Sequence, residues 1–178
     1  MSAHGPGSIL VTVLDTPIGP LSLLAHDGAL VGGGFTADPA ELHVRMHPSL
    51  RALELATARQ DDLSWLVKPM RGYLEGDVGA FDGLTVHQPG TPSRQRLWAA
   101  MRAVAPGTTV SYAVLAAQAG NPDAPRAAGA ACAANLIAPV VPCHRVLRTG
   151  GSLGGYYYGL DRKRWLLRHE DTLGGRCG

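Results

Sequence analysis

The residues best able to do chemistry in this chain stand side by side: Cys143, His144 and Arg145. A histidine next to a thiol is able to draw off its proton, directly or through a water molecule, and an arginine adds positive potential that favours the thiolate. The thiolate is the form of cysteine that acts as a nucleophile. The three residues therefore indicate a nucleophilic cysteine, and the alternative is a buried structural thiol beside two solvated polar residues.

The other cysteines and histidines do not indicate a metal site. No second cysteine or histidine stands at ligand spacing from Cys143, and no cysteine precedes Cys132. Four histidines of the first half lack a thiolate partner there: His26, His43, His47 and His87. We therefore expect no zinc and no other cofactor. Three cysteines without the spacing of a disulfide framework favour a reducing compartment, and Cys177, in a glycine-rich tail, is expected to be a dispensable exposed thiol.

Length and composition exclude several classes of protein. The 178 residues are 46% hydrophobic, which is enough for one domain or two small ones. The longest apolar runs, residues 127–134 and 136–141, are far shorter than the about 20 residues that span a bilayer. The first eight residues contain no lysine or arginine and so do not resemble a signal peptide. We expect a cytoplasmic protein with no membrane partner, associated with the nucleoid if it is bacterial.

Charged residues divide unevenly along the chain, although the formal net charge is only +2. Residues 1–87 carry five basic and ten acidic side chains, and residues 88–178 carry eleven basic and four acidic ones. The net charges of the two parts are therefore −5 and +7. Such asymmetry indicates a module that faces a polyanion next to one that does not. We place the boundary of two domains, 1–87 and 88–178, at the loop-like segment His87-Gln-Pro-Gly-Thr-Pro92.

The first domain is predicted to be α+β, with a small antiparallel sheet and helices. Apolar, strand-like runs cover residues 9–14, 21–25 and 29–35. Asp27-Gly28 predicts a tight hairpin turn between the last two runs. Apolar spacing is compatible with helices over residues 51–58 and 63–74.

The second domain is predicted to be mainly α, with a winged helix-turn-helix-like DNA-binding motif. Thr91-Pro92 predicts the start of a helix, with a hydroxyl cap and proline at the first helical position, and Pro106-Gly107 ends it. A second helix fits residues 111–119, capped by Ser111, and a short turn leads to a third over residues 125–134. A last helix, 162–169, carries basic residues that are either a DNA-facing surface or an ordinary solvated face: Arg162, Lys163, Arg164 and Arg168.

The third predicted helix is unusual because its side chains are small: Arg126-Ala-Ala-Gly-Ala-Ala-Cys-Ala-Ala134. Small side chains permit close approach either to neighbouring helices or to a flat partner. The basic charge of this domain favours the second interpretation, a helix whose amide dipoles and Arg126 approach a DNA duplex.

Pro142-Cys-His-Arg-Val146 resembles the active-site motif of the O6-alkylguanine-DNA alkyltransferases, also called methylated-DNA–protein-cysteine methyltransferases. Other motifs match in order and spacing: Gly107-Thr-Thr-Val-Ser-Tyr112, Ala119-Gly-Asn-Pro122, Arg126-Ala-Ala-Gly129, Asn135 and Arg162-Lys-Arg-Trp-Leu-Leu-Arg-His-Glu170. The resemblance covers nearly the whole chain, strongly over residues 107–170. It is weaker over residues 9–35, where Asp15-Thr-Pro-Ile-Gly-Pro-Leu21 is similar to the first hairpin of the family.

The resemblance implies DNA repair by direct reversal of damage. A monomer without a cofactor would bind double-stranded DNA that contains O6-alkylguanine, flip the nucleotide out of the stack, and transfer the alkyl group to Cys143. The O6-alkyl carbon lies inside the base stack, so the nucleotide must be extruded before a protein group can attack it. The thioether product has no easy route back, and a single turnover follows.

The resemblance also implies a role for individual residues. Cys143 is the acceptor, His144 the general base through a water, and Glu170 orients that histidine. Asn135 ties the end of a helix to the active-site turn, and Tyr112 crowds the target phosphate and helps to protonate the departing guanine. The expected DNA contacts are Arg126, which would fill the space left in the stack, and Ser111, Ala127, Gly129 and Arg145. The expected substrate pocket consists of Pro142, Val146, Tyr156, Tyr157, Tyr158 and Gly159.

The chain departs from the family pattern at three places. Tyr157 and Tyr158 replace small residues of the pocket loop, which suggests that bulky O6 adducts react poorly while O6-methyl is retained. Leu136-Ile-Ala-Pro139 replaces a proline directly after Asn135, so the hinge backbone is expected to differ. Ser93-Arg94 replaces a Phe-Gln pair in the first helix of the second domain.

Three other functions are compatible with parts of this pattern. A non-catalytic alkyltransferase-like protein would bind the lesion and recruit others, but such relatives lack the acceptor cysteine. A thiol hydrolase using Cys143, His144 and Glu170 would need an oxyanion hole, for which the sequence offers no specific signal. A plain helix-turn-helix regulator would leave Pro142-Cys-His-Arg-Val146 unexplained.

Overall fold

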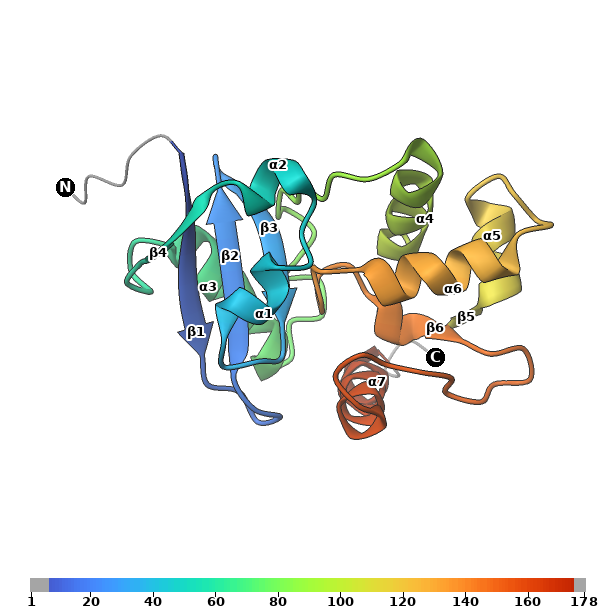
Figure 1. Cartoon of the computed structure of the whole chain (residues 1–178). Coiled ribbons are helices and arrows are strands. Elements are labelled where there is room, and N and C mark those ends of the chain that lie inside the picture. The colour runs from blue at the N-terminus through green and yellow to red at the C-terminus, as the bar shows by residue number, and fades with distance from the viewer. Residues whose placement is uncertain (1–6, 175–178) are drawn as a thin grey trace. The chain divides into compact units, whose positions relative to one another are not determined.

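The computed structural model describes residues 7–174, with the side chains of residues 7–171. It divides the chain into two compact units, with the division between Pro89 and Gly90 (Figure 1). The first unit combines a small sheet with helices, and the second is mainly helical, which confirms the predicted fold class. No helix within residues 7–174 is both long and apolar enough to cross a bilayer.

A four-stranded sheet forms the centre of the first unit. Its strands are β1 (Ser8–Leu14), β2 (Leu21–His26), β3 (Ala29–Gly34) and β4 (Glu54–Thr57), in the order β3-β2-β1-β4. The predicted hairpin turn is confirmed, because Asp27 and Gly28 both have positive φ, as the tight turns that match strand twist require. Every residue of β2 from Leu21 to Ala25 is buried, as in a strand that is covered on both faces.

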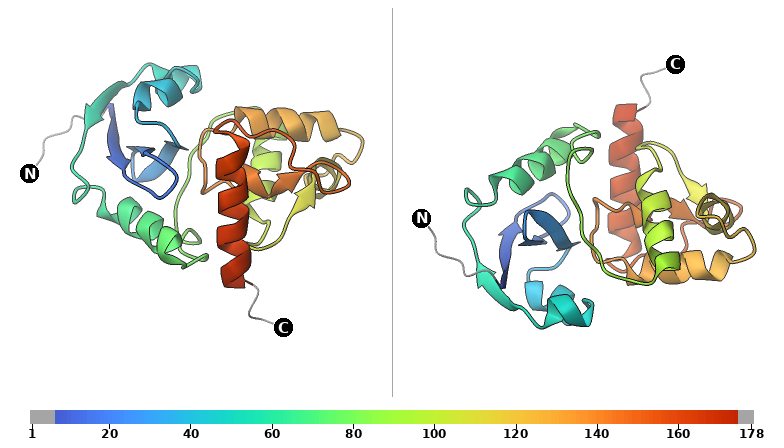
Figure 2. Two further views of the ribbon diagram at one scale, coloured as in Figure 1. Left: turned by 90° about the horizontal axis from the view of Figure 1, so that it is seen from below. Right: turned by 90° about the horizontal axis from the view of Figure 1, so that it is seen from above.

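Three helices pack on this sheet: α1 (Pro39–His43), α2 (Pro48–Arg51) and α3 (Ser64–Glu75). Figure 2 shows α1 and α2 on one face of the sheet and α3 on the other. α3 contains Pro69 and ends at Gly76, whose left-handed conformation (φ 117°) suits glycine. The first unit therefore has three layers around an apolar core.

Two expectations for the first unit are wrong. The spacing of residues 51–58 predicts a helix, but β4 occupies half of that segment. The sheet is mixed rather than antiparallel, because β4 pairs in parallel with β1, with Ile9 opposite Leu55. The open edge of β1 supplies a row of backbone partners, and these decide the structure of a short segment whose intrinsic preference is weak.

The predicted helix-turn-helix is present in the second unit. It consists of α5 (Tyr112–Gln118) and α6 (Pro125–Ala134), and α4 (Pro92–Arg102) precedes it. The hydroxyl of Thr91 caps α4, and that of Ser111 accepts a hydrogen bond from Val114 N at 3.1 Å and caps α5. Trp98 Nε1 donates to the carbonyl of Ala131 at 2.9 Å and so fixes α4 against α6.

The segment Pro142-Cys-His-Arg-Val146 follows this helical group in the chain and contacts the last helix. A 3₁₀ turn, η1 (Cys143–Arg145), leads directly into β6 (Val146–Leu147), which pairs in parallel with β5 (Val110–Ser111). α7 (Leu160–Gly174) is longer than the predicted 162–169. Because β5 immediately precedes α5, the pairing of β5 with β6 holds the start of α5 beside the cysteine turn.

Candidate active site

The cysteine turn is buried on all sides except for one opening. Residues 135–146 are all buried, and Cys143 itself is 9% exposed. Its backbone N–H donates to the carbonyl of Val141 at 2.9 Å, which starts the tight turn. A nucleophile in such a turn is held in place by the backbone rather than by a flexible loop, as a precise reaction geometry requires.

Asn135, which follows the last residue of α6, ties that helix to the cysteine turn. Its side-chain Nδ2 donates to the carbonyl of Val141 at 2.8 Å and to Cys143 Sγ at 3.3 Å. Its Oδ1 accepts from the backbone N–H of Ile137 at 3.1 Å. The amide is therefore fully used in a buried site, and it positions the sulfur from one side.

His144 and Glu170 form a fully buried pair. His144 Nε2 lies 2.7 Å from Glu170 Oε1, and both side chains have no exposed surface. Burial alone would raise the pKa of Glu170, but hydrogen bonds and charge from His144 and Arg145 outweigh it and hold that pKa well below its usual range. A carboxylate has no proton to give, so His144 donates from Nε2 and carries its lone pair on Nδ1.

The histidine in this pair is suited to act as a base. Burial lowers the pKa of His144, and the favourable interaction with Glu170 only partly offsets this, so the ring is neutral at neutral pH. Its Nδ1 is buried and has no hydrogen-bond partner among residues 7–174. A buried, unprotonated nitrogen of this kind is an acceptor in need of a donor.

Arg145 has a different place from the one expected. The sequence suggested a DNA contact that also favours the thiolate, but the side chain is 5% exposed and points into the protein. Its guanidinium donates to both oxygens of Glu170, at 2.9 Å each, and to the carbonyl of Val104. Such a two-point ion pair commits the arginine to stabilising the carboxylate, so it is not available for a phosphate.

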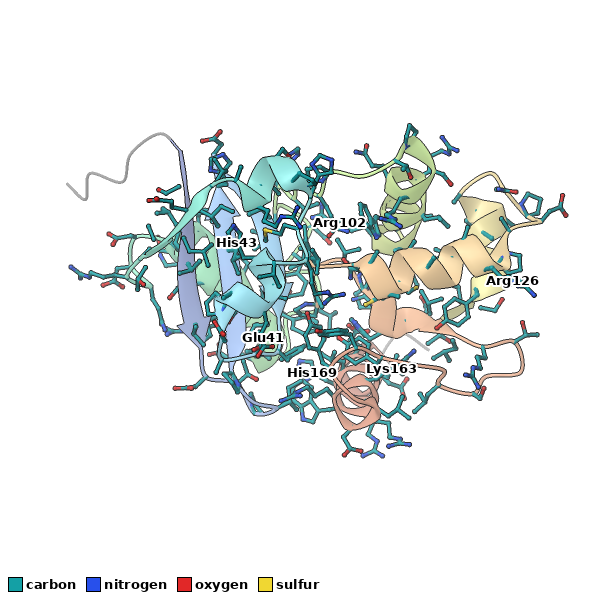
Figure 3. All side chains as sticks on the ribbon, viewed as in Figure 1. Glu41, His43, Arg102, Arg126, Lys163 and His169 are labelled. Atoms are coloured by element: carbon teal, nitrogen blue, oxygen red, sulfur yellow. The ribbon has the colours of Figure 1, made fainter. Side chains whose placement is uncertain are left out.

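The cation near the thiol is Lys163, for which the sequence left open a DNA-facing surface or an ordinary solvated face. Lys163 comes from α7 (Figure 3). It is fully buried, and its Nζ donates to the carbonyls of Val146, Leu153 and Gly155. Burial raises the pKa of Cys143, whereas the hydrogen bond from Asn135 and the charge of Lys163 lower it. The lysine thus connects the cysteine turn to the loop that follows it and favours the thiolate.

Cys143 opens into a cavity of about 220 Å³. Its walls come from the start of α5, the face of α6 and the loop before α7; they are Tyr112, Gly129, Cys132, Ala133, Asn135, Cys143, Gly155, Tyr156, Tyr157 and Tyr158. The volume is several times the roughly 30 Å³ that one water occupies in the liquid. The site therefore has room for an organic group in front of the sulfur.

Three consecutive tyrosines form one wall of this cavity. The ring of Tyr158 is buried and meets Tyr156 and Tyr157 edge to face, with centroid distances of 5.7 and 5.0 Å. Tyr157 is 61% exposed. Edge-to-face contacts of this kind stabilise an aromatic cluster by about 0.5–1.5 kcal/mol per pair beyond burial. The extra rings are thus built into the wall of the pocket.

The sequence matches known proteins over most of its length. Residues 92–172 match the family model described as "6-O-methylguanine DNA methyltransferase, DNA binding domain". A methylated-DNA–protein-cysteine methyltransferase of Salmonella typhimurium is 36% identical over 168 residues, which cover 93% of this chain and 97% of that protein. The chain belongs to the methylated-DNA–protein-cysteine methyltransferase family.

Solved structures of this family share the fold. The crystal structure of Mycobacterium tuberculosis OGT in complex with DNA superposes with a TM-score of 0.78 at 34% sequence identity, covering 92% of this chain and 94% of that one. An archaeal O6-methylguanine-DNA methyltransferase from Pyrococcus kodakaraensis gives a TM-score of 0.66 at 24% identity, which shows likeness of fold.

The residues expected to face DNA lie along α5 and α6. Arg126 is exposed at the first turn of α6 (Figure 3), far along the helix from Asn135. Gly129 lies beside the ring of Tyr112, where an added Cβ would meet Cδ1 at 4.0 Å. Ser111 caps α5, and Ala127 is partly exposed. Of these four residues Gly129 lines the cavity, and all four belong to the same unit as Cys143.

The pocket differs in part from the one expected. Pro142 and Val146, which flank the cysteine turn in the chain, are buried, and Gly159 is an exposed loop residue with φ 94°. None of the three lines the cavity. Cys132, Ala133 and Gly155 line it instead. The helical spacing of Gly129, Cys132 and Ala133, three and four residues apart, is the signal that would have placed them on one face.

The described part of the chain contains no group of three or more His, Cys, Asp or Glu side chains arranged to hold a metal ion. Cys177, expected to be an exposed thiol, lies outside the described residues.

Proposed function

We propose that this protein repairs O6-alkylguanine in double-stranded DNA by moving the alkyl group, once and irreversibly, onto Cys143 Sγ, and that it acts as a monomer. One observation carries the proposal: Cys143 opens into an organic-sized cavity and directly precedes a buried His144–Glu170 pair. A nucleophile, a base and a group that orients the base are the parts that nucleophilic catalysis requires.

The DNA is held by the helix-turn-helix of the second unit. The exposed start of α6, with Arg126, approaches the duplex, and its small residues Ala127 and Gly129 let the helix come close to the backbone. Arg126 takes the space that the extruded nucleotide leaves in the base stack. The guanine then enters the cavity beside Tyr112, and its O6 substituent points towards the sulfur.

Proton transfer prepares the thiol. A water in the cavity floor bridges Cys143 Sγ–H and His144 Nδ1, so the proton leaves sulfur and arrives on the imidazole. The resulting imidazolium is stabilised by the Glu170 carboxylate at 2.7 Å, and Arg145 keeps that carboxylate ionised and fixed. Because burial raises the pKa of Cys143, this transfer is needed before the sulfur can attack.

The alkyl transfer itself is a displacement at carbon. The thiolate forms an S–C bond while the C–O6 bond breaks, and the electron pair of that bond goes to the guanine. Tyr112 provides the proton that neutralises the leaving guanine. Burial and the nearby thiols Cys132 and Cys143 raise the pKa of Tyr112, so the phenol remains protonated until the base departs. The thioether left on Cys143 ends the reaction.

The pocket loop sets the size of the group that fits. Lys163 holds the loop through the carbonyls of Leu153 and Gly155, and the Tyr158 ring is packed between its two neighbours. The wall therefore has little freedom to retreat from a bulky substituent. O6-methylguanine is the expected substrate, and larger adducts react more slowly.

The test uses a duplex with a single O6-methylguanine and the intact mass of the protein. The expected result is a gain of one CH₂ on Cys143, stoichiometric with DNA, and no gain in Cys143→Ser. Repeated release of methanol or another methyl product would instead show a hydrolase. Tight binding without any mass change would show a lesion-binding protein. Sedimentation of the free and DNA-bound protein tests the monomer.

A further inference from the structure

A second cysteine lies in the cavity and neither accepts the alkyl group nor carries a proton in the proposed alkyl transfer. Cys132 is on α6, is partly exposed, and lines the same cavity as Cys143 together with Gly129 and Ala133 of its own helix face. Among residues 7–174 these are the two cysteines, and both are free thiols. The cavity thus brings together a nucleophilic sulfur and a second sulfur on its wall.

The two cysteines are connected through one residue. Asn135 stands three positions after Cys132 and donates from its backbone N–H to the Cys132 carbonyl at 3.2 Å. The side chain of the same asparagine holds Cys143 Sγ at 3.3 Å. Lys163 lies close enough to both sulfurs for its charge to lower the pKa of each thiol. The end of α6 and the cysteine turn therefore hold the thiols as neighbours, with open cavity rather than packed side chains in front of them.

We propose that Cys132 is the resolving thiol of an oxidative modification site, and that a peroxide converts Cys132 and Cys143 into a reversible intramolecular disulfide. In the first step the Cys143 thiolate attacks one peroxide oxygen, the O–O bond breaks, and the products are a sulfenic acid and hydroxide for hydrogen peroxide. In the second step Cys132 Sγ attacks the Cys143 sulfur, the S–O bond breaks, and its oxygen leaves as water with the Cys132 proton. The sulfurs are oxidised by two electrons and the peroxide is reduced.

The order of the steps follows from the surroundings of each thiol. Burial raises the pKa of both thiols, that of Cys132 to about 12, and the charge of Lys163 lowers the pKa of both. Cys143 differs in its geometry, because its Sγ accepts a hydrogen bond from Asn135 and its neighbour His144 has an acceptor nitrogen, Nδ1, without a donor. Cys143 is therefore the sulfur that is activated and reacts with the oxidant first, and Cys132 is the thiol that then attacks it. The disulfide prevents further oxidation of Cys143 to the sulfinic acid, which thiol reductants do not reverse.

This modification goes beyond the proposed function, because it requires two thiols and a peroxide but no DNA. Its failure would leave alkyl transfer untouched, and a protein that transferred no alkyl group could still form the disulfide. While the disulfide is present, Cys143 has no thiol to accept an alkyl group. Oxidation therefore inactivates the protein reversibly, and a reductant restores the Cys143 thiol and its activity.

The sequence offers a direct assay. Arg126 and Arg145 flank both cysteines, so trypsin releases them in one peptide, residues 127–145, and Cys177 falls in a different one. The full-length Cys177→Ser protein is treated with hydrogen peroxide, blocked with iodoacetamide and digested without reductant. The expected peptide is two hydrogens lighter than the reduced peptide and unalkylated, and dithiothreitol returns it to the reduced mass. Prior reaction with an O6-methylguanine duplex gives a methylated peptide that never becomes lighter.

The matched variant is Cys132→Ala, which extends the alanine-rich face of α6, and Cys132→Ser is a second version in case one folds poorly. With either change the lighter peptide no longer forms. After treatment with peroxide and then dithiothreitol, the parent recovers its alkyl-acceptor activity, whereas either variant recovers only a small part of its own. The proposal is overturned if the parent peptide gains oxygen at Cys143 and never loses two hydrogens. It is also overturned if the variants recover activity as fully as the parent. A parent peptide that gains oxygen without losing two hydrogens would mean that the Cα atoms of Cys132 and Cys143 stay farther apart than the roughly 7 Å that a disulfide spans.

Discussion

Replacing Glu170 by glutamine separates the role of this carboxylate's charge from that of its shape. In the protein Glu170 has no exposed surface and makes three hydrogen bonds to charged or polarised donors, one from His144 at 2.7 Å and two from Arg145 at 2.9 Å. Glutamine keeps one acceptor oxygen, but its NH₂ group faces a donor. Arg145 is then left buried without a counter-charge.

Two losses of known size follow from this geometry. Removing one partner of a buried ion pair costs about 3–5 kcal/mol, so we expect the free energy of unfolding to fall by that amount. For catalysis, exchange of the orienting carboxylate for an amide in a serine-protease triad lowers kcat by about 10⁴-fold. His144 in our proposal acts through a water, which makes the proton path longer, so we expect the single-turnover rate of Glu170→Gln to fall by about 10²–10⁴-fold.

The assays are a rapid-quench measurement of methyl transfer from an O6-methylguanine duplex and urea unfolding followed by circular dichroism. Asp171→Asn is the matched control, because it makes the same chemical change at the neighbouring, exposed position of α7. The control should keep its rate, and its stability should change by no more than about 0.5 kcal/mol. If Glu170→Gln transfers methyl groups within threefold of the parent rate, the histidine does not act as the base that we describe.

The same pair predicts how stability depends on pH. The folded pKa of Glu170 lies well below the unfolded value of about 4.3. A group whose pKa is depressed by folding contributes its full stabilisation above the unfolded pKa, and that contribution is lost as the pH falls towards the folded value. The stability difference between the parent and Glu170→Gln should therefore be constant from pH 7 to about 5 and shrink below about pH 4. A difference that does not change with pH would contradict the ion pair.

Three further predictions concern the pocket and the DNA surface. Tyr158→Gly should raise the rate with O6-benzylguanine relative to O6-methylguanine by about 10-fold or more, because a small change in the size of a pocket changes the ratio of the rates of two substrates by about that factor. An unchanged ratio of the two rates would reject the steric role of Tyr158. Lys163→Met should shift the pH–rate profile to higher pH, because the charge of Lys163 lowers the pKa of Cys143, and an unmoved profile would show that the lysine only holds the loop. Arg126→Ala should slow repair of a duplex but leave the reaction with the free base O6-benzylguanine unchanged, whereas equal slowing of both would place Arg126 outside DNA binding.

Several features were predictable because they depend on local sequence. The N-caps Thr91 and Ser111, the hairpin turn Asp27-Gly28 and the alanine-rich helix α6 follow from short-range hydrogen bonding and backbone preference. β4 was not predictable in this way, because its partner strand lies more than forty residues away and its own side chains fit a helix equally well. Which short segment completes an open sheet edge is decided by the fold.

The sequence by itself determined the chemistry, because a cysteine, a histidine and a distant glutamate in this motif carry their reactivity in their side chains. Only the tertiary structure decided which cationic side chain lies beside which anionic group. Arg145, adjacent to the cysteine, turns inward to Glu170, while Lys163, twenty positions away, comes to lie beside the thiol. Burial is the physical reason, because a charged group removed from water is stable only beside a partner of opposite charge or a hydrogen-bonding group. The fold determines which partner is near, and the distance between two residues along the sequence does not reveal it.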